Sequence, residues 1–81
     1  MKYAIQFIGF DQNSYSAMDW EYYTGAQYSV NHESYAISDR NINQAKLYSG
    51  KKRAENAVNS MYGKFTNVAE ARIVPVEKVS N

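Results

Sequence analysis

Residues 18–30 alternate between apolar and polar side chains, and this alternation limits the possible folds more than any other feature of the chain. The even positions hold Met, Trp, Tyr, Thr, Ala, Tyr and Val, whereas the odd positions hold Asp, Glu, Tyr, Gly, Gln and Ser, and Asn31 follows. Because successive side chains of a strand point to opposite faces, a period of two predicts a β-strand with one buried face. We expect even-numbered side chains such as Trp20 and Tyr22 to face the core beneath a helix, and odd-numbered side chains to face solvent.

Gly25 lies in the middle of this alternation and predicts a change of direction. A straight strand over the whole segment would span about 43 Å at roughly 3.3 Å per residue, which is too long for so small a domain. A three-residue loop of Tyr23, Thr24 and Gly25 would pair Tyr22 with Ala26, and it would place glycine where a left-handed residue is needed. We prefer this hairpin loop, and a bent strand through Gly25 is the alternative.

Three other segments also have the composition of strands. Residues 2–10 predict a strand at the centre of the sheet, residues 45–48 predict a short strand, and a last strand passes through Ile73 and Val74. Pro75 cannot donate a hydrogen bond to a neighbouring strand, so the last strand lies at a sheet edge or ends there.

The segment between the alternating residues and the short strand at 45–48 has weaker patterns. Residues 31–34 (NHES) predict a turn, and residues 35–38 (YAIS) predict either a short strand or an irregular return. Ser38 could begin a helix, but Ile42 is the one apolar anchor that follows it, so we expect a single helical turn or a loop.

The clearest helical pattern begins after Ser49, which we expect to cap a helix running from Gly50 or Lys51 to Tyr62, with Gly63 as its C-terminal stop. The spacing of three and four residues places on one face Ala54, Ala57, Val58, Met61, Tyr62 and Phe65. The predicted fold is therefore α+β: an antiparallel sheet of about four strands with one α-helix packed on one face, in the order strands, helix, strand.

Composition explains how so short a chain could form one core and limits its chemistry. We expect residues 1–81 to form a single domain, with large rings filling its core, because 15% of the residues are aromatic and eight are tyrosine. The absence of cysteine excludes disulfides, cysteine-ligated zinc and thiol catalysis. No segment has the pattern of a signal peptide or a membrane span, so we expect a soluble cytoplasmic protein that makes no membrane contact.

Charge is unevenly distributed along the chain. Residues 1–39 carry one base against five acids, a net charge of −4, whereas residues 40–81 carry eight bases against three acids, a net charge of +5. An acidic and a basic surface on one small body predict a partner that is attracted electrostatically.

The sequence offers little that could support catalysis. His32 is the single histidine and lies in a predicted turn, which makes a metal site improbable. Asp19 and Glu21 would point the same way on a strand, yet nothing near them in the sequence supplies a nucleophile or a pocket. We expect a protein that is not an enzyme and has no cofactor and no metal.

Two surfaces are candidates for binding. Tyrosine is enriched at interface hot spots, so an exposed Tyr23 within an acidic rim of Asp19 and Glu21, with Tyr15 and Tyr35 on the sheet, predicts a site for a protein partner. Such a surface could imitate nucleic acid toward a basic host protein. The same tyrosines could instead form a homodimer contact.

The alternative surface is basic and lies at the predicted strand-to-helix junction, where it could bind the phosphates of a nucleic acid. Its bases in the first turn of the helix lie at the positive end of the helix dipole, an unfavourable choice that suggests a function. The cluster consists of Arg40, Lys46, Lys51, Lys52 and Arg53.

The stretch AKLYSGKKRAENAVNSMY, residues 45–62, resembles small accessory proteins encoded by bacteriophages and prophages of Gram-positive bacteria, and the resemblance covers about residues 45–76. The same stretch is similar to the end of the arm-type DNA-binding domain of phage tyrosine integrases, where a three-stranded sheet precedes such a helix and basic strands contact the DNA. The phage resemblance implies a short, non-enzymatic protein that acts on a host component, for example as an anti-defence inhibitor.

Overall fold

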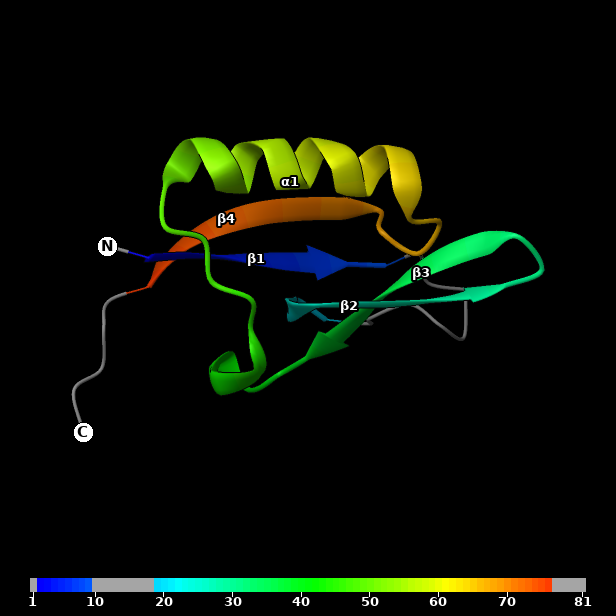
Figure 1. The fold of residues 1–81 in the computed structure, drawn as a ribbon. Coiled ribbons are helices and arrows are strands. Elements are labelled where there is room, and N and C mark those ends of the chain that lie inside the picture. Colours follow the sequence, from blue (N-terminus) through cyan, green and yellow to red (C-terminus); the bar gives the residue numbers. More distant parts are fainter. Residues whose placement is uncertain (1, 10–18, 77–81) are drawn as a thin grey trace.

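The computed structural model describes residues 2–9 and 19–76, which form an antiparallel sheet with one helix on one face (Figure 1). The sheet order is β3-β2-β1-β4. This arrangement confirms the predicted α+β fold, the order of strands, helix and strand, the central first strand and the last strand at an edge. The elements are β1 (Lys2–Ile8), β2 (Glu21–Val30), β3 (Glu33–Asp39), the 3-10 helix η1 (Ile42–Gln44), α1 (Lys51–Lys64) and β4 (Glu70–Val76).

The position of β2 in the sheet reverses the predicted direction of its side chains. Phe7 of β1 lies opposite Glu21 of β2, so odd-numbered residues of β2 share the helix-covered face with the buried Phe7. Tyr23 is accordingly only 8% exposed and lies in the core. Its ring centroid is 6.5 Å from that of Phe7 and 5.8 Å from that of Phe65. The prediction that even-numbered side chains point beneath the helix is therefore wrong.

The even-numbered aromatic residues lie on the face of the sheet without the helix. Trp20 and Tyr22 are half-buried there, and the guanidinium carbon of Arg72 is 4.1 Å from the centroid of the Trp20 ring. Both faces of the sheet thus carry large rings. An alternating pattern indicates two different faces, but it does not indicate which of them the helix covers.

β2 continues through Gly25 as one strand, which confirms the bent-strand alternative and contradicts the preferred three-residue loop. The pairing with β3 shifts between Tyr23 and Gln27, and Gly25 has a φ of 87°. Tyr22 lies opposite Asp39 of β3 rather than Ala26.

The hairpin turn comes later, inside the predicted turn at residues 31–34. Asn31 and His32 have positive φ values of 51° and 68°, as the favoured two-residue hairpin turns require. His32 therefore lies at an exposed hairpin tip.

The helix α1 begins at Lys51, as predicted, but both helices are capped by residues other than the predicted serines. The N-cap of α1 is Gly50, without a side-chain hydrogen bond, and the helix continues past Gly63 to Lys64. It ends where Phe65 adopts an extended backbone and enters the core. η1 is capped by Asn41, whose side chain accepts a hydrogen bond from the backbone N–H of Asn43 at 2.9 Å.

The predicted strand at residues 45–48 does not form. These residues connect η1 to α1, and Tyr48 makes a single β-bridge to Tyr3. Tyr48 and Tyr3 of β1 exchange two backbone hydrogen bonds of 2.9 and 2.8 Å. On the other side, the Lys46 N–H donates to the backbone oxygen of Tyr23 in β2 at 2.9 Å. This connection joins β1 and β2 beside the N-terminal end of α1, and it forms one wall of the site described next.

Candidate functional site

The structure does not assemble the predicted acidic and aromatic surface. Tyr23 is buried under the helix, whereas Tyr35 is 6% exposed and belongs to the opposite face of the sheet, because its neighbour Ala36 faces the helix-covered core. Asp19 is exposed, and Tyr15 lies outside the described residues. The predicted exposure of Tyr23, on which this surface depended, is therefore wrong.

Glu21 is also engaged within the fold. Its carboxylate accepts a hydrogen bond from the Ser38 hydroxyl at 2.7 Å and one from the Arg40 Nε at 3.4 Å. The Glu21 side chain is only 18% exposed. Glu21 is therefore not a free acid of the predicted rim, and Arg40, whose side chain is 78% exposed, does not line the pocket described next.

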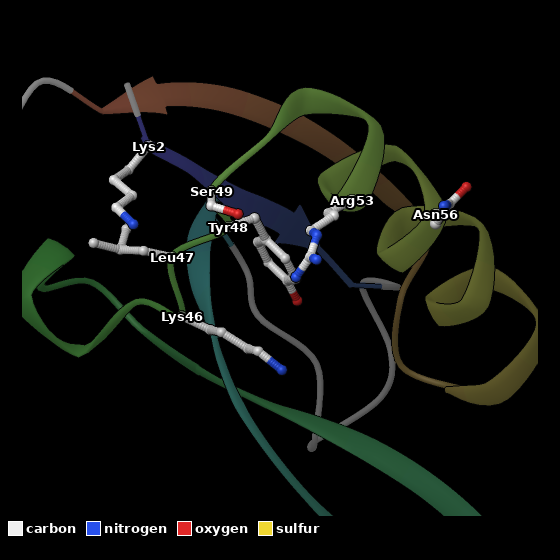
Figure 2. Close-up of a pocket in the computed structure, with 7 residues that line it drawn as sticks. All are labelled: Lys2, Lys46, Leu47, Tyr48, Ser49, Arg53 and Asn56. Atoms are coloured by element: carbon white, nitrogen blue, oxygen red, sulfur yellow. The ribbon is translucent and has the colours of Figure 1, made fainter.

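Two of the remaining basic residues line a pocket of about 450 Å³ near the N-terminal end of α1 (Figure 2). Lys46 and Arg53 of the predicted cluster line it, and Lys51 and Lys52 are exposed in the same first helical turn as Arg53. The complete lining is Lys2, Lys46, Leu47, Tyr48, Ser49, Arg53 and Asn56. We call this the basic pocket.

Three separate parts of the chain bring the cations together. Lys2 begins β1, Lys46 belongs to the connection before α1, and Arg53 lies in the first turn of α1. The two hydrogen bonds between Tyr3 and Tyr48 hold the first two parts side by side. Sequence reasoning missed Lys2, because its proximity to the junction depends on this long-range pairing and not on spacing along the chain.

Gly25 helps to position Lys46. A Cβ atom added at Gly25 would lie 2.9 Å from the Cδ atom and 3.3 Å from the Cβ atom of Lys46. A glycine at this position therefore lets the aliphatic part of the lysine cross β2 closely. The Lys46 ammonium then lies 5.4 Å from the centroid of the Tyr48 ring.

The helix orients Arg53 from above the sheet. Ala54 is completely buried, which anchors the first turn of α1 against the strands. Asn56 follows Arg53 by three residues and therefore lies on the same side of the helix. In Figure 2 the Arg53 guanidinium is directed toward the Tyr48 side chain, and Lys46 extends below both.

The electrostatics of the basic pocket favour an anion. Lys2, Lys46 and Arg53 contribute three positive charges, and none of the described lining residues is an acid. Within the described part of the chain, the one ion pair is that of Arg40 with Glu21. The three cations of the pocket thus have no carboxylate partner among the residues that the structure describes.

Tyr48 adds a neutral hydroxyl to the lining. Burial raises the pKa of Tyr48 above its ordinary value of 10.0, and the neighbouring Tyr23 raises this pKa further. The Tyr48 hydroxyl consequently stays protonated at neutral pH and can donate a hydrogen bond. Together with Ser49 and Asn56, it gives the pocket uncharged donors beside its cations.

The described residues lack the features of a metal site and of a membrane-spanning helix. They contain no group of three or more His, Cys, Asp or Glu side chains that could hold a metal ion. None of the helices found in residues 2–9 and 19–76 has the length and apolar character needed to cross a membrane. No family model, curated protein or solved structure matches the chain.

Proposed function

We propose that this protein is a non-catalytic nucleic-acid-binding protein that holds the phosphate backbone of its partner in the basic pocket. The observation that carries this proposal is the convergence of Lys2, Lys46 and Arg53 on one pocket without an acid among its described lining residues. Lysine and arginine bind phosphates through charge-assisted hydrogen bonds, and neutralising phosphates releases the counterions bound to the nucleic acid. Lys51 and Lys52, exposed beside Arg53, extend the positive surface.

This function fits the geometry better than recognition of a host protein through the sheet. The predicted protein-binding surface required an exposed Tyr23, but Tyr23 packs against Phe7 and Phe65. Lys46 and Arg53, in contrast, line the pocket beside the start of α1. A role as a phage accessory protein is part of this proposal.

The test is fluorescence anisotropy with labelled single- and double-stranded DNA and RNA at two salt concentrations. If the pocket neutralises three phosphates, the logarithm of the binding constant should fall with the logarithm of salt with a slope of about −2 to −3. Binding should then weaken roughly 20- to 40-fold between about 50 and about 200 mM salt. Absence of salt-dependent binding to all four nucleic acids would contradict the proposal.

Matched variants locate the binding site on the protein. Lys46→Gln and Arg53→Gln each remove one charge from the pocket, and each should lower the salt slope by roughly 0.7 to 0.9. Lys64→Gln is the control, because it removes the same charge from the last turn of α1, beside the Phe65 ring and away from the pocket lining. An equal effect of all three variants would mean that net charge, and not the pocket, controls binding.

A further inference from the structure

Leu47 gives the basic pocket a feature that phosphate binding alone does not explain. This residue lines the pocket between Lys46 and Tyr48, yet 47% of its surface is exposed to solvent. In Figure 2 the side chains of Lys2 and Leu47 occupy the same side of the pocket. A large apolar side chain thus lies beside Lys2 in a pocket that Lys46 and Arg53 also line.

The outer surface of a nucleic-acid duplex does not match this combination. In a duplex the bases are stacked inside, and a protein meets mainly sugars and phosphates unless it enters a groove. The pocket is an open depression of about 450 Å³ that leaves a bound group partly exposed to solvent. An unstacked nucleotide offers both a phosphate for the cations and an apolar base face for Leu47.

We infer that the basic pocket selects single-stranded nucleic acid by holding one unstacked nucleotide, with its base against Leu47, while Lys2, Lys46 and Arg53 bind its phosphate and the phosphates on either side of it. This inference rests on the proposed function and adds the form of the nucleic acid to it. The backbone hydrogen bonds of Tyr48 to Tyr3 hold the segment that carries Lys46 and Leu47 beside the start of β1, which carries Lys2. The base and the phosphates can therefore be contacted at the same time.

The test compares binding of a labelled oligothymidylate, the matching duplex and inorganic polyphosphate, which carries charge without bases. The oligothymidylate should bind at least about tenfold more tightly than the duplex or the polyphosphate at equal phosphate concentration. Leu47→Thr should weaken oligothymidylate binding by roughly tenfold, because it removes the apolar surface that the base covers, and should leave polyphosphate binding unchanged. Lys46→Gln should weaken binding of all three ligands.

Ile37→Thr is the control for Leu47→Thr. Ile37 is an exposed apolar residue of similar size, 37% exposed, in β3 and not part of the pocket lining. This variant should bind oligothymidylate like the unmodified chain, and circular dichroism should show that both threonine variants are folded.

The outcomes separate this inference from the function on which it depends. Equal or tighter binding of the duplex, together with no effect of Leu47→Thr, would overturn the selection of single strands and leave nucleic-acid binding intact. Polyphosphate that binds as tightly as oligothymidylate would also overturn it. Failure of all three ligands to bind would overturn the proposed function itself.

Discussion

The side-chain amide of Asn67 pairs with the backbone of Ala36 as a neighbouring β-strand would. The Ala36 N–H donates to Asn67 Oδ1 at 2.9 Å, and Asn67 Nδ2 donates to the Ala36 carbonyl oxygen at 3.0 Å. Asn67 is completely buried. Next to it, the Thr66 N–H donates to the backbone oxygen of Ser34 at 3.0 Å. The connection between α1 and β4 thereby covers the outer edge of β3, which would otherwise be open to another chain.

Asn67→Ala should lower the free energy of unfolding by about 2–4 kcal/mol, because it leaves both backbone groups of the buried Ala36 without their partner. Urea unfolding followed by circular dichroism measures this change. Asn59→Ala is the matched control: Asn59 is exposed on α1, and alanine favours helices, so stability should be unchanged or rise by about 0.5 kcal/mol. If Asn67→Ala lowers the free energy of unfolding by no more than a typical surface substitution does, the amide pairing contributes little.

Asn67→Asp should make stability depend on pH in a defined direction. An ionised carboxylate accepts the Ala36 N–H but cannot donate to the Ala36 carbonyl, so the folded state favours the protonated acid and raises its pKa. The stabilising donor is present below the unfolded pKa of about 3.9 and is lost as the pH rises through the folded pKa. The stability deficit of this variant relative to the unmodified chain should therefore be smaller at about pH 4 than at about pH 7.

Gly25→Ala and Gly63→Ala should change stability in opposite directions. At Gly25 the φ of 87° and the short approach to Lys46 both oppose a Cβ atom, and we expect a loss of about 1–3 kcal/mol. At Gly63, inside α1, an added Cβ meets no atom within 4 Å, and we expect a gain of about 1 kcal/mol. Thermal and urea unfolding of both variants check these values. Gly25→Ala should also weaken oligonucleotide binding, since Lys46 must move, and unchanged binding would argue against the positioning role of Gly25.

The protein should lose stability in alkaline solution. Burial raises the pKa of Tyr23 above its ordinary value of 10.0, and burial together with Tyr23 raises the pKa of Tyr48. A raised folded pKa contributes stability that is complete below about pH 10 and is lost as the pH rises through the folded pKa. Urea unfolding at a series of pH values above about pH 9 measures this decline. Tyr48→Phe should make this loss of stability with pH shallower. If the loss is the same in the variant, groups other than Tyr48 cause it.

Tyr62→Phe should expose the edge of β4. The Tyr62 hydroxyl accepts the Ala71 N–H at 2.7 Å and donates to the Ala71 carbonyl oxygen at 3.3 Å. The variant should lose about 0.5–1.5 kcal/mol of stability, and the Ala71 amide should exchange hydrogen faster by nuclear magnetic resonance. The amide of Ile73, which faces the same edge two residues later, serves as the internal control. No change at Ala71 would show that the hydroxyl does not protect it.

The same edge is also protected against pairing with a strand of another chain. At one end of β4, Tyr62 occupies the outward backbone groups of Ala71, and at the other end Pro75 has no N–H to offer. Since a chain that pairs with an edge strand needs free donors and acceptors in succession, this arrangement disfavours dimerisation through β4.

Local patterns were sufficient for the elements whose geometry depends on neighbouring residues. The spacing of apolar residues predicted α1, the turn-forming residues predicted the hairpin tip at Asn31 and His32, and Pro75 indicated an edge strand. The basic cluster at the start of α1 was equally visible, because Lys51, Lys52 and Arg53 are adjacent in the chain.

By itself, the sequence determined that this protein has alternating strands, one amphipathic helix and a basic junction between them. Only the tertiary structure decided which face of β2 is buried, because that choice depends on Phe7 pairing with Glu21 and not on the alternation within β2. It likewise decided that Lys2 joins Lys46 and Arg53 in one pocket. Both results come from hydrogen bonds between residues distant in the chain, whose register no local pattern of side chains specifies.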